Sequence, residues 1–390
     1  MITVSQARAL LFDLIAPMPG EQVPLSQAAG RVLCEDAVAQ RDQPPFAAAS
    51  MDGYAMNAAE VEQHALFKVI GEAAAGRRFA GRVGAGQAVR IFTGAPVPDG
   101  ADFVVIQEDI SRKGDLITII EHPSPKDNIR PLGIDFRAGT TVSAPRLLHA
   151  KDVALLAAMN IPRVSVTRKP VIALISNGDE LVMPGETPGP DQIIVSNTFG
   201  LKALLEGIGA DVRMLPIARD SVSSLTTAFD LAKGADLVVT IGGASVGDHD
   251  LVERVAAELG LDRSFYKVLM RPGKPLMAGR LGNAAMVGLP GNPVSAMVCG
   301  YIFIAPMVLA MLGLGTDVPP LRSAPLAHGL TANGPRAHYM RGQLENGQIT
   351  VFDDQDSSLL TVLAQANVLV VRPAKDHARQ AGADVDYLAI

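Results

Sequence analysis

The sequence predicts a multidomain α/β and β protein built around a central doubly wound parallel sheet. A chain of 390 residues is too long for one ordinary hydrophobic core. Residues 171–312 alternate short strand-like runs with helical patterns, whereas residues 42–135 lack helical periodicity and are rich in turns. We therefore expect a helix-rich, elongated N-terminal domain (1–41 plus 136–170), an inserted all-β domain (42–135), an α/β domain (171–317) and a C-terminal β domain (318–390).

The composition is that of a globular protein that does not bind nucleic acid. Hydrophobic residues make up 48% of the chain, charged residues 19%, and the mean hydropathy is +0.24. The net charge is −6, and the aromatic residues are 12 Phe and 5 Tyr with no Trp. Such a chain lacks the basic surface and the stacking side chains of nucleic-acid-binding proteins. The composition is still compatible with a small anionic ligand that local basic loops hold.

The chain carries no sign of secretion, a disulfide framework or a zinc site. Its first residues, with Asp13 inside an apolar run and no basic segment before it, are typical of an amphipathic helix and not of a signal peptide. Cys34 and Cys299 lie far apart in the sequence, so we expect inert buried thiols. These features favour the cytoplasm.

One segment is apolar enough to cross a membrane. No charged residue occurs from Leu281 to Thr316. The segment follows a strand-like run, contains Gly300 and Pro306, and lacks flanking Lys/Arg clusters. We therefore expect a helix buried in a core or a subunit interface, and no membrane contact.

The α/β domain is predicted strand by strand. Strand-like runs, separated mostly by helical patterns, are "VIALIS", "VRMLPI", "LVVTIGG", "FYKVLM" and "AMVGLPG". In the first helical segment, Leu201, Leu204, Leu205 and Ile208 follow helical spacing, and Ser196 or Asn197 can cap its start. Strand, helix and strand in this rhythm predict parallel strands covered on both faces.

Polar loops follow each of these strand-like runs. Because ligands bind outside the carboxyl ends of strands in open parallel sheets, the loops predict one functional rim. Its charged residues are Glu180, Asp220, Asp248, Asp250, Arg271 and Lys274. A helix cap explains any one of the acids, but not acids and bases at the ends of successive strands.

The loop that begins at Gly242 combines glycines suited to phosphate with two aspartates and no lysine. Backbone N–H groups at a helix start attract an anion, which Asp248 and Asp250 would repel. A divalent cation resolves the conflict, since Mg²⁺ is commonly held by carboxylates and phosphate oxygens. Within this loop alone, a capping aspartate is the simpler explanation.

The usual catalytic motifs are missing from the sequence. The histidines show no metal-binding spacing, and no G-x-S-x-G elbow occurs. Carboxylates, amines and glycine turns remain. This inventory suits Mg²⁺-assisted chemistry on phosphate groups, where positioning and charge neutralisation dominate.

Seven ordered motifs, which cover essentially the whole chain, resemble the molybdopterin molybdenumtransferase family, to which the gephyrin E domain is related. They are "MDGYA" (51–55), "FTGAPVPDGADFVVIQE" (92–108), "NIRPLGIDFRAG" (128–139), "SNGDELV" (176–182), "TIGGASVGDHD" (240–250), "RPGKP" (271–275) and "GLPGNPVSA" (288–296). The resemblance implies a homodimer whose sites are shared between subunits. It also implies insertion of molybdenum from molybdate into adenylylated molybdopterin, with Mg²⁺-dependent release of AMP, and an adenylyltransferase and molybdoenzyme maturation proteins as partners.

The resemblance assigns roles residue by residue. It implies these catalytic residues: Asp52, Asp135, Glu180, Asp220, Asp250, Lys267 and Arg271. Of these, Glu180, Asp220 and Asp250 are the implied metal ligands. The implied cofactor-binding residues are Gly242, Gly243, Ser245, Gly247, Asp248, Gly273, Lys274, Pro290, Gly291, Asn292 and Ser357, the last within the divergent pattern "DQDSS".

Some positions depart from the family pattern or have a structural alternative. Asn177 stands in place of a usual Ser or Thr, and Arg271 in place of the Lys of some members. Asp52 can serve in an Asp-Gly turn, and Asp220 can cap the helix at Ser221. The alternative function is a non-catalytic molybdopterin-binding or scaffold protein, and a weaker one is a nucleotide phosphohydrolase. The complete set of acids favours catalysis.

Overall fold

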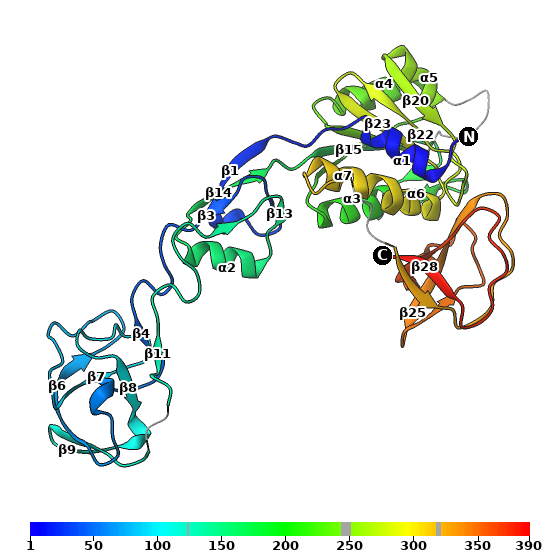
Figure 1. The fold of residues 1–390 in the computed structure, drawn as a ribbon. Coiled ribbons are helices and arrows are strands. Elements are labelled where there is room, and N and C mark those ends of the chain that lie inside the picture. Colours follow the sequence, from blue (N-terminus) through cyan, green and yellow to red (C-terminus); the bar gives the residue numbers. More distant parts are fainter. Residues whose placement is uncertain (123–124, 243–250, 317–320) are drawn as a thin grey trace.

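The computed structural model shows an elongated chain of compact units (Figure 1). The structure describes residues 1–122, 125–242, 251–316 and 321–390. An α/β unit lies at one end of the molecule and an all-β unit at the other, with a smaller unit between them. The C-terminal unit lies beside the α/β unit.

The sheet of the α/β unit is mixed. Its strand order is β18-β15-β19-β23-β22-β20. The strands are β15 (Val171–Ser176), β18 (Asp211–Met214), β19 (Leu237–Ile241), β20 (Leu261–Tyr266), β22 (Met277–Leu281) and β23 (Ala284–Leu289). The first four strands in the order are parallel, but β22 runs antiparallel to both β23 and β20. The predicted parallel sheet is therefore wrong at this edge, because a two-residue turn with Gly282 at φ +59° joins β22 to β23 as a hairpin.

Helices cover both faces of this sheet, as the doubly wound prediction requires. One face packs against α3 (Asn197–Gly207), α6 (Pro293–Cys299) and α7 (Ala305–Met311). The other packs against α4 (Val222–Leu231) and α5 (Leu251–Glu258). Side chains therefore alternate between two cores along each strand: Leu174 belongs to the first and Ile175 to the second.

The long apolar segment is a buried helix of the core. Helices α6 and α7 are joined by a π-helical segment, η4 (Gly300–Ile304), and within the described residues Pro293–Met311 is the one helical run that passes a length-and-hydropathy test for membrane spanning. The window is 83% buried, which confirms the predicted core helix. Pro306 has no N–H to bond the Ile302 carbonyl, and Arg8 Nε donates to that oxygen at 3.1 Å instead.

The N-terminal helix belongs to this core and not to the middle unit. Helix α1 (Val4–Phe12) begins with a capping box between Thr3 and Gln6, and it buries Val4, Ala7 and Leu11 in the α/β core. An amphipathic stripe fixes the buried face of a helix but not its partner, so sequence reasoning assigned α1 to the wrong unit.

The middle unit is not helix-rich, which corrects that prediction. It consists of the sheet β1-β14-β2-β13, the strand pair β3–β12 and helix α2 (Ala150–Ala158). The strands are β1 (Gly20–Pro24), β2 (Val32–Leu33), β3 (Ala37–Val38), β12 (Thr141–Val142), β13 (Arg146–Leu147) and β14 (Arg163–Thr167). Asp236 ties this unit to the α/β sheet by accepting two hydrogen bonds from Arg168, at 2.8 and 3.0 Å.

The distal unit is built of strands and short 3-10 turns. Its sheet has the order β8-β5-β7-β6-β10-β9, and the pair β4 (Ala48–Ala49) and β11 (Ile129–Arg130) lies where its two connecting chains enter. The strands of the sheet are β5 (Gly53–Met56), β6 (Leu66–Ala73), β7 (Gln87–Ile91), β8 (Phe103–Ile106), β9 (Ile110–Lys113) and β10 (Leu116–Ile119).

The C-terminal unit is a sheet that borrows one strand from the preceding chain. Its path is β21-β25-β27-β28-β24, with β26 paired to β25. The elements are β21 (Met270–Arg271), β24 (Arg322–Pro325), β25 (Ala337–Glu345), β26 (Gln348–Val351), α8 (Leu360–Gln365), β27 (Val368–Arg372) and β28 (Asp384–Ala389). The short β21 runs parallel to β25, so the two units share backbone hydrogen bonds.

Candidate functional site

The polar loops meet at the carboxyl edge of the α/β sheet. The chain leaves β15 towards β18 on one side, and β19 lies on the other side, so the strand order switches between β15 and β19. Such switch points open a crevice for ligands. Asn177 N donates to Ile241 O, Gly242 N donates to Leu289 O, and a Cβ on Gly291 would lie 3.5 Å from Gly242 Cα. The ends of β15, β19 and β23 are therefore in direct contact.

Asp220 is held at this edge by its neighbours. Its backbone N donates to Asp179 Oδ1 at 3.1 Å, and its Oδ1 accepts from Asn177 Nδ2 at 3.3 Å. The amide of Asn177 must turn its donor to the carboxylate, which leaves Asn177 Oδ1 buried without a partner. The side chain of Asp220 itself is exposed, so this arrangement presents it to a ligand.

Glu180 folds back over a glycine. Gly178 has φ +147°, and a Cβ at that position would lie 2.2 Å from Glu180 Oε2. Only glycine leaves room for this carboxylate. Arg219 Nη1 donates to the carbonyls of Asp179 and Leu181 at 3.1 Å, which fixes the loop from the β18 side.

The rest of the glycine loop lies outside the described residues. This applies to Gly243, Ser245, Gly247, Asp248 and Asp250. Residues 1–122, 125–242, 251–316 and 321–390 contain no group of three His, Cys, Asp or Glu side chains that could hold a metal ion. The predicted set of Glu180, Asp220 and Asp250 therefore stays a prediction.

The loop after β23 contacts the C-terminal unit. Asn292 Nδ2 donates to Ser357 Oγ at 3.0 Å, and Val294 N donates to Ser357 O at 3.1 Å. Asn197 Nδ2 donates to Gly291 O at 2.7 Å. Pro290 is buried beside this exposed Gly-Asn pair. The predicted residues Gly291, Asn292 and Ser357 are thus brought together from two units.

The basic residues after β20 lie on a tight loop. Lys267 has φ +67° and places its ammonium 4.7 Å from the ring centroid of Tyr266. Gly273 has φ +101°, and a Cβ there would lie 2.5 Å from Cys299 Sγ. Arg271 and Lys274 are exposed. The loop therefore directs two cations outward from a backbone that requires glycine at its centre.

Sequence reasoning missed two residues at the junction with the C-terminal unit. Arg341 is fully buried, its Nη2 donates to Asp354 O at 3.1 Å, and its Nε and Nη1 have no partner. His338 pairs in register with Arg271 on one side and with Arg372 on the other. Burial, followed by the charges of Arg271 and Arg341 and then of Arg372 and Arg336, lowers the pKa of His338 to about 4.

Four arginines therefore make the junction positive around His338, although Asp354 and Asp356 lie near Arg341 and Asp376 pairs with Arg372. Burial also lowers the pKa of Arg341. A buried cation with unpaired donors is costly unless an anion or a hydrogen-bond acceptor reaches it. The only sequence signal was an arginine inside the apolar alternation of "AHYMRGQL", which by itself is unspecific.

Asp52 and Asp135 lie on the distal part of the chain. Asp52 Oδ1 accepts from Thr93 N at 2.7 Å and from Thr93 Oγ1 at 2.8 Å. These hydrogen bonds hold the pKa of Asp52 below its usual range. Asp135 is exposed, and its backbone N donates to Gln43 O. Figure 1 shows that this region lies far along the molecule from the α/β rim of the same chain.

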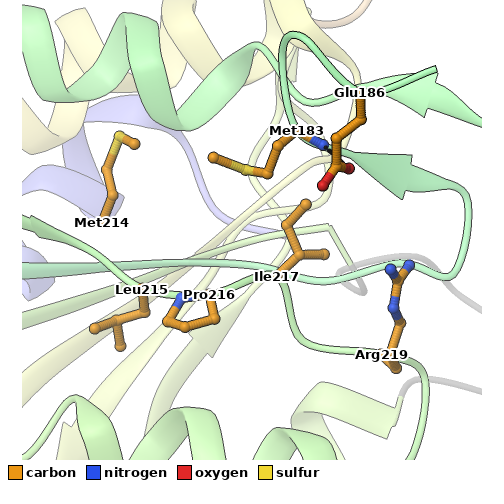
Figure 2. Close-up of a pocket in the computed structure, with 7 residues that line it drawn as sticks. All are labelled: Met183, Glu186, Met214, Leu215, Pro216, Ile217 and Arg219. Atoms are coloured by element: carbon orange, nitrogen blue, oxygen red, sulfur yellow. Dashed lines mark hydrogen bonds between the residues drawn. The ribbon is translucent and has the colours of Figure 1, made fainter. Parts of the chain in front are cut away.

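A cavity of about 390 Å³ lies beside the rim, at the outer edge of β18. Figure 2 shows Met183, Met214, Leu215 and Ile217 along it, with Glu186 and Arg219 towards one end. Glu186 Oε2 accepts from Met183 N at 2.9 Å. The predicted site residues are not among its lining, so the cavity adjoins the rim without forming it.

Comparison with known proteins matches the chain from end to end. Three family models cover it: "MoeA N-terminal region (domain I and II)" over residues 2–160, "Probable molybdopterin binding domain" over residues 173–310, and "MoeA C-terminal region (domain IV)" over residues 323–390. Molybdopterin molybdenumtransferase of Haemophilus influenzae is 36% identical over 95% of this chain and 94% of its own length. The Nostoc sp. protein of that name is 33% identical over 100% and 94%.

Solved structures show the same similarity in three dimensions. Two structures of the molybdopterin biosynthesis moeA protein of Pyrococcus horikoshii align with TM-scores of 0.86 and 0.84, at 30% and 27% sequence identity. Both cover 100% of this chain, and they are covered over 99% and 100% of their own lengths.

Proposed function

Because this chain belongs to the molybdopterin molybdenumtransferase family, we propose that it inserts molybdenum from molybdate into adenylylated molybdopterin and releases AMP. The observation that carries this proposal is the positive junction around Arg341. Its unpaired Nε and Nη1 donors need acceptors, and a tetrahedral oxyanion supplies them. Arg271, exposed next to them, adds a second planar fork.

The neighbouring loops support binding of the organic substrate. Gly242 and Gly291 lie where β19 and β23 end, and because they have no side chains a ligand can approach the main chain closely there. Lys267 and Lys274 offset the negative charge of a substrate that carries two phosphates. AMP leaves when a water oxygen bonds to the adenylyl phosphorus and the bond from that phosphorus to the pterin phosphate oxygen breaks; the pterin keeps its phosphate, and the protons of the water pass to solvent.

The donor set at the rim fits Mg²⁺. Glu180 and Asp220 offer exposed carboxylates, and Asn177 Oδ1 is a buried oxygen without a partner. These are the hard oxygen ligands that Mg²⁺ takes. The proposed ligands are Glu180, Asp220 and Asp250, and the bound ion would neutralise charge on the phosphates. Asn177 holds the carboxylate of Asp220 in place through its amide donor.

The proposed active unit is a homodimer. Asp52 and Asp135 follow β4 and β11, which lie far along the elongated chain from its own rim, so in this proposal they complete the rim of a second copy. A two-fold pairing gives two equivalent sites, each built from the distal unit of one chain and the α/β unit of the other. A molybdopterin adenylyltransferase and maturation proteins of molybdoenzymes are proposed partners, and the cytoplasm is the proposed compartment.

Complementation tests the shared site. Asp52→Ala chains mixed with Glu180→Ala chains and allowed to exchange subunits should recover about a quarter of the wild-type activity, because half of the dimers hold one intact site. The matched control mixes Asp52→Ala with Asp135→Ala chains, in which every shared site keeps one defect. Recovery in both mixtures, or in neither, would contradict the shared arrangement.

AMP release from adenylylated molybdopterin tests the reaction itself. With Mg²⁺ present, we expect release that depends on added molybdate. Tight pterin binding without release under either condition would favour a carrier or scaffold. Hydrolysis of a generic nucleotide in the absence of a pterin would favour a phosphohydrolase.

A further inference from the structure

The turn of residues 353–358, between β26 and α8, is anchored by one glutamine side chain. Gln355 Oε1 accepts from Arg341 N at 2.9 Å, and Gln355 Nε2 donates to Arg341 O at 3.0 Å. The same Nε2 donates to Phe352 O at 2.7 Å. Both ends of the carboxamide therefore bond the backbone of a single residue, as a neighbouring strand would.

This contact supplements the last backbone hydrogen bond on this side of Arg341, in which Phe352 N donates to Arg341 O at 3.1 Å. The pairing of β25 with β26 ends at Gly342 and Val351. On its other side Arg341 pairs with Leu369 of β27. Gln355 thus supplies the only acceptor that the structure gives for Arg341 N among the residues it describes, and it shares Arg341 O with Phe352 N, so both backbone polar groups of Arg341 are held from the β26 side.

The same turn also holds the guanidinium. Asp354, next to Gln355, accepts from Arg341 Nη2 through its carbonyl at 3.1 Å. Within the described part of the chain, this is the one side-chain hydrogen bond given for Arg341, and its Nε and Nη1 are buried without partners. Movement of Gln355 would therefore move both the backbone and the head group of Arg341.

The far end of the turn reaches the α/β unit. Ser357 contacts Asn292 through its hydroxyl and Val294 through its carbonyl, at 3.0 and 3.1 Å. Asp356 stiffens the turn by accepting from Ser358 N and Oγ at 2.8 and 2.6 Å. Gln355 therefore lies in the turn that joins Arg341 to the contact between Ser357 and Asn292, and the proposed function uses both.

We infer that Gln355 is a positioning residue, which sets the place of Arg341 at the junction without touching the substrate. The inference rests on the proposed function, in which Arg341 binds molybdate. A carboxamide is required because the site needs one acceptor and one donor side by side. The apolar side chain of methionine fills the same space but supplies neither.

The test compares Gln355→Met with the matched control Gln348→Met, an exposed glutamine of β26 for which the structure gives no side-chain hydrogen bond. We expect the molybdate concentration for half-maximal AMP release to rise about tenfold in Gln355→Met, because the two hydrogen bonds that hold the Arg341 backbone are lost. The maximal rate should change less, and the control should match the wild type. An unchanged half-saturation in Gln355→Met overturns the inference.

A double-mutant cycle separates positioning from a general structural role. If Gln355 acts through Arg341, Gln355→Met should add no further loss of molybdate affinity in an Arg341→Met background. An equal loss in both backgrounds would show that Gln355 acts elsewhere. Calorimetry measures the molybdate affinity of each variant, and thermal unfolding shows whether each variant is folded.

An NMR signal keeps the inference testable if the proposed function fails. In the wild type, a fixed Arg341 should give a sharp Nε–H signal, and Gln355→Met should broaden or shift it. An unchanged signal refutes positioning, whatever the enzyme does with molybdate. A changed signal in a protein that does not bind molybdate supports positioning and rejects the oxyanion role of Arg341.

Discussion

His338 allows the positive junction to be measured as a pH dependence of stability. Its pKa is lowered from 6.5 to about 4 in the folded protein, whereas in the unfolded chain it titrates near its ordinary value. Between these two values the unfolded state binds more protons, so the folded state loses stability as the pH falls. The loss on going from pH 7.5 to pH 5 is about 2 kcal/mol from this one side chain.

His338→Gln removes the linkage because glutamine does not titrate in this range. Urea unfolding followed by circular dichroism at both pH values should show the wild type losing about 2 kcal/mol more than the variant on acidification. The exposed His328→Gln of the same unit is the matched control and should behave as the wild type does. Equal losses in the wild type and His338→Gln would refute the reasoning.

An anion at the junction should reverse part of this effect. Molybdate would offset the charges of Arg271 and Arg341 and thereby raise the pKa of His338 in the folded protein. The difference between the pKa values of the folded and unfolded states would then be smaller. Saturating molybdate should therefore reduce the acid loss of the wild type but leave His338→Gln unaffected. An identical acid loss with and without molybdate would place the anion elsewhere.

Two further predictions follow from single contacts, and a third follows from the proposed metal site. Thr93→Val removes the hydroxyl that donates to Asp52 and keeps the backbone donor, so the pKa of Asp52 should rise towards its usual range in a carboxyl NMR titration. Gly53→Ala would place a Cβ 2.0 Å from Val105 O, so thermal or urea unfolding should show a loss of about 3 kcal/mol or more. Asp250→Ala, at a position outside the described residues, should lower AMP release far more than pterin binding, and an equal loss of both would contradict a role limited to the metal step.

Each of the first two predictions has an outcome that contradicts it. An unchanged pKa of Asp52 in Thr93→Val would show that the hydroxyl contributes nothing beyond the Thr93 backbone donor. For Gly53, the control is Gly334→Ala, because a Cβ at Gly334 meets no atom within 4 Å. Equal stability of the two alanine variants would contradict the steric argument.

The sequence predicts the rim because its signals are local. Apolar runs such as Val171–Ser176 end in polar loops, and parallel strands bring their carboxyl ends to the same edge. The direction of β22 is not encoded in this way, since an apolar run has the same appearance in either orientation. The short turn at Gly282 was the available signal for a hairpin.

Long-range partners were beyond prediction from one sequence. The stripe of Val4, Ala7 and Leu11 predicts a buried face but not the helix that covers it. Arg341 is similar, because its importance comes from unpaired donors at a junction that two units create together. Asn177 was noted as a departure, yet its contact with Asp220 depends on how the loops after β15 and β18 approach each other.

The buried helix Pro293–Met311 has a consequence for how the protein is made. Most residues of the core that it joins, including Leu174 of β15, Val239 of β19 and Leu205 of α3, precede it in the chain. When this segment leaves the ribosome, most of the surface that shields it has already been synthesised, and the part contributed by the C-terminal unit, such as Tyr339 and Leu369, comes later. The order of synthesis therefore limits the time during which the most apolar part of the chain is exposed to chaperones and aggregation.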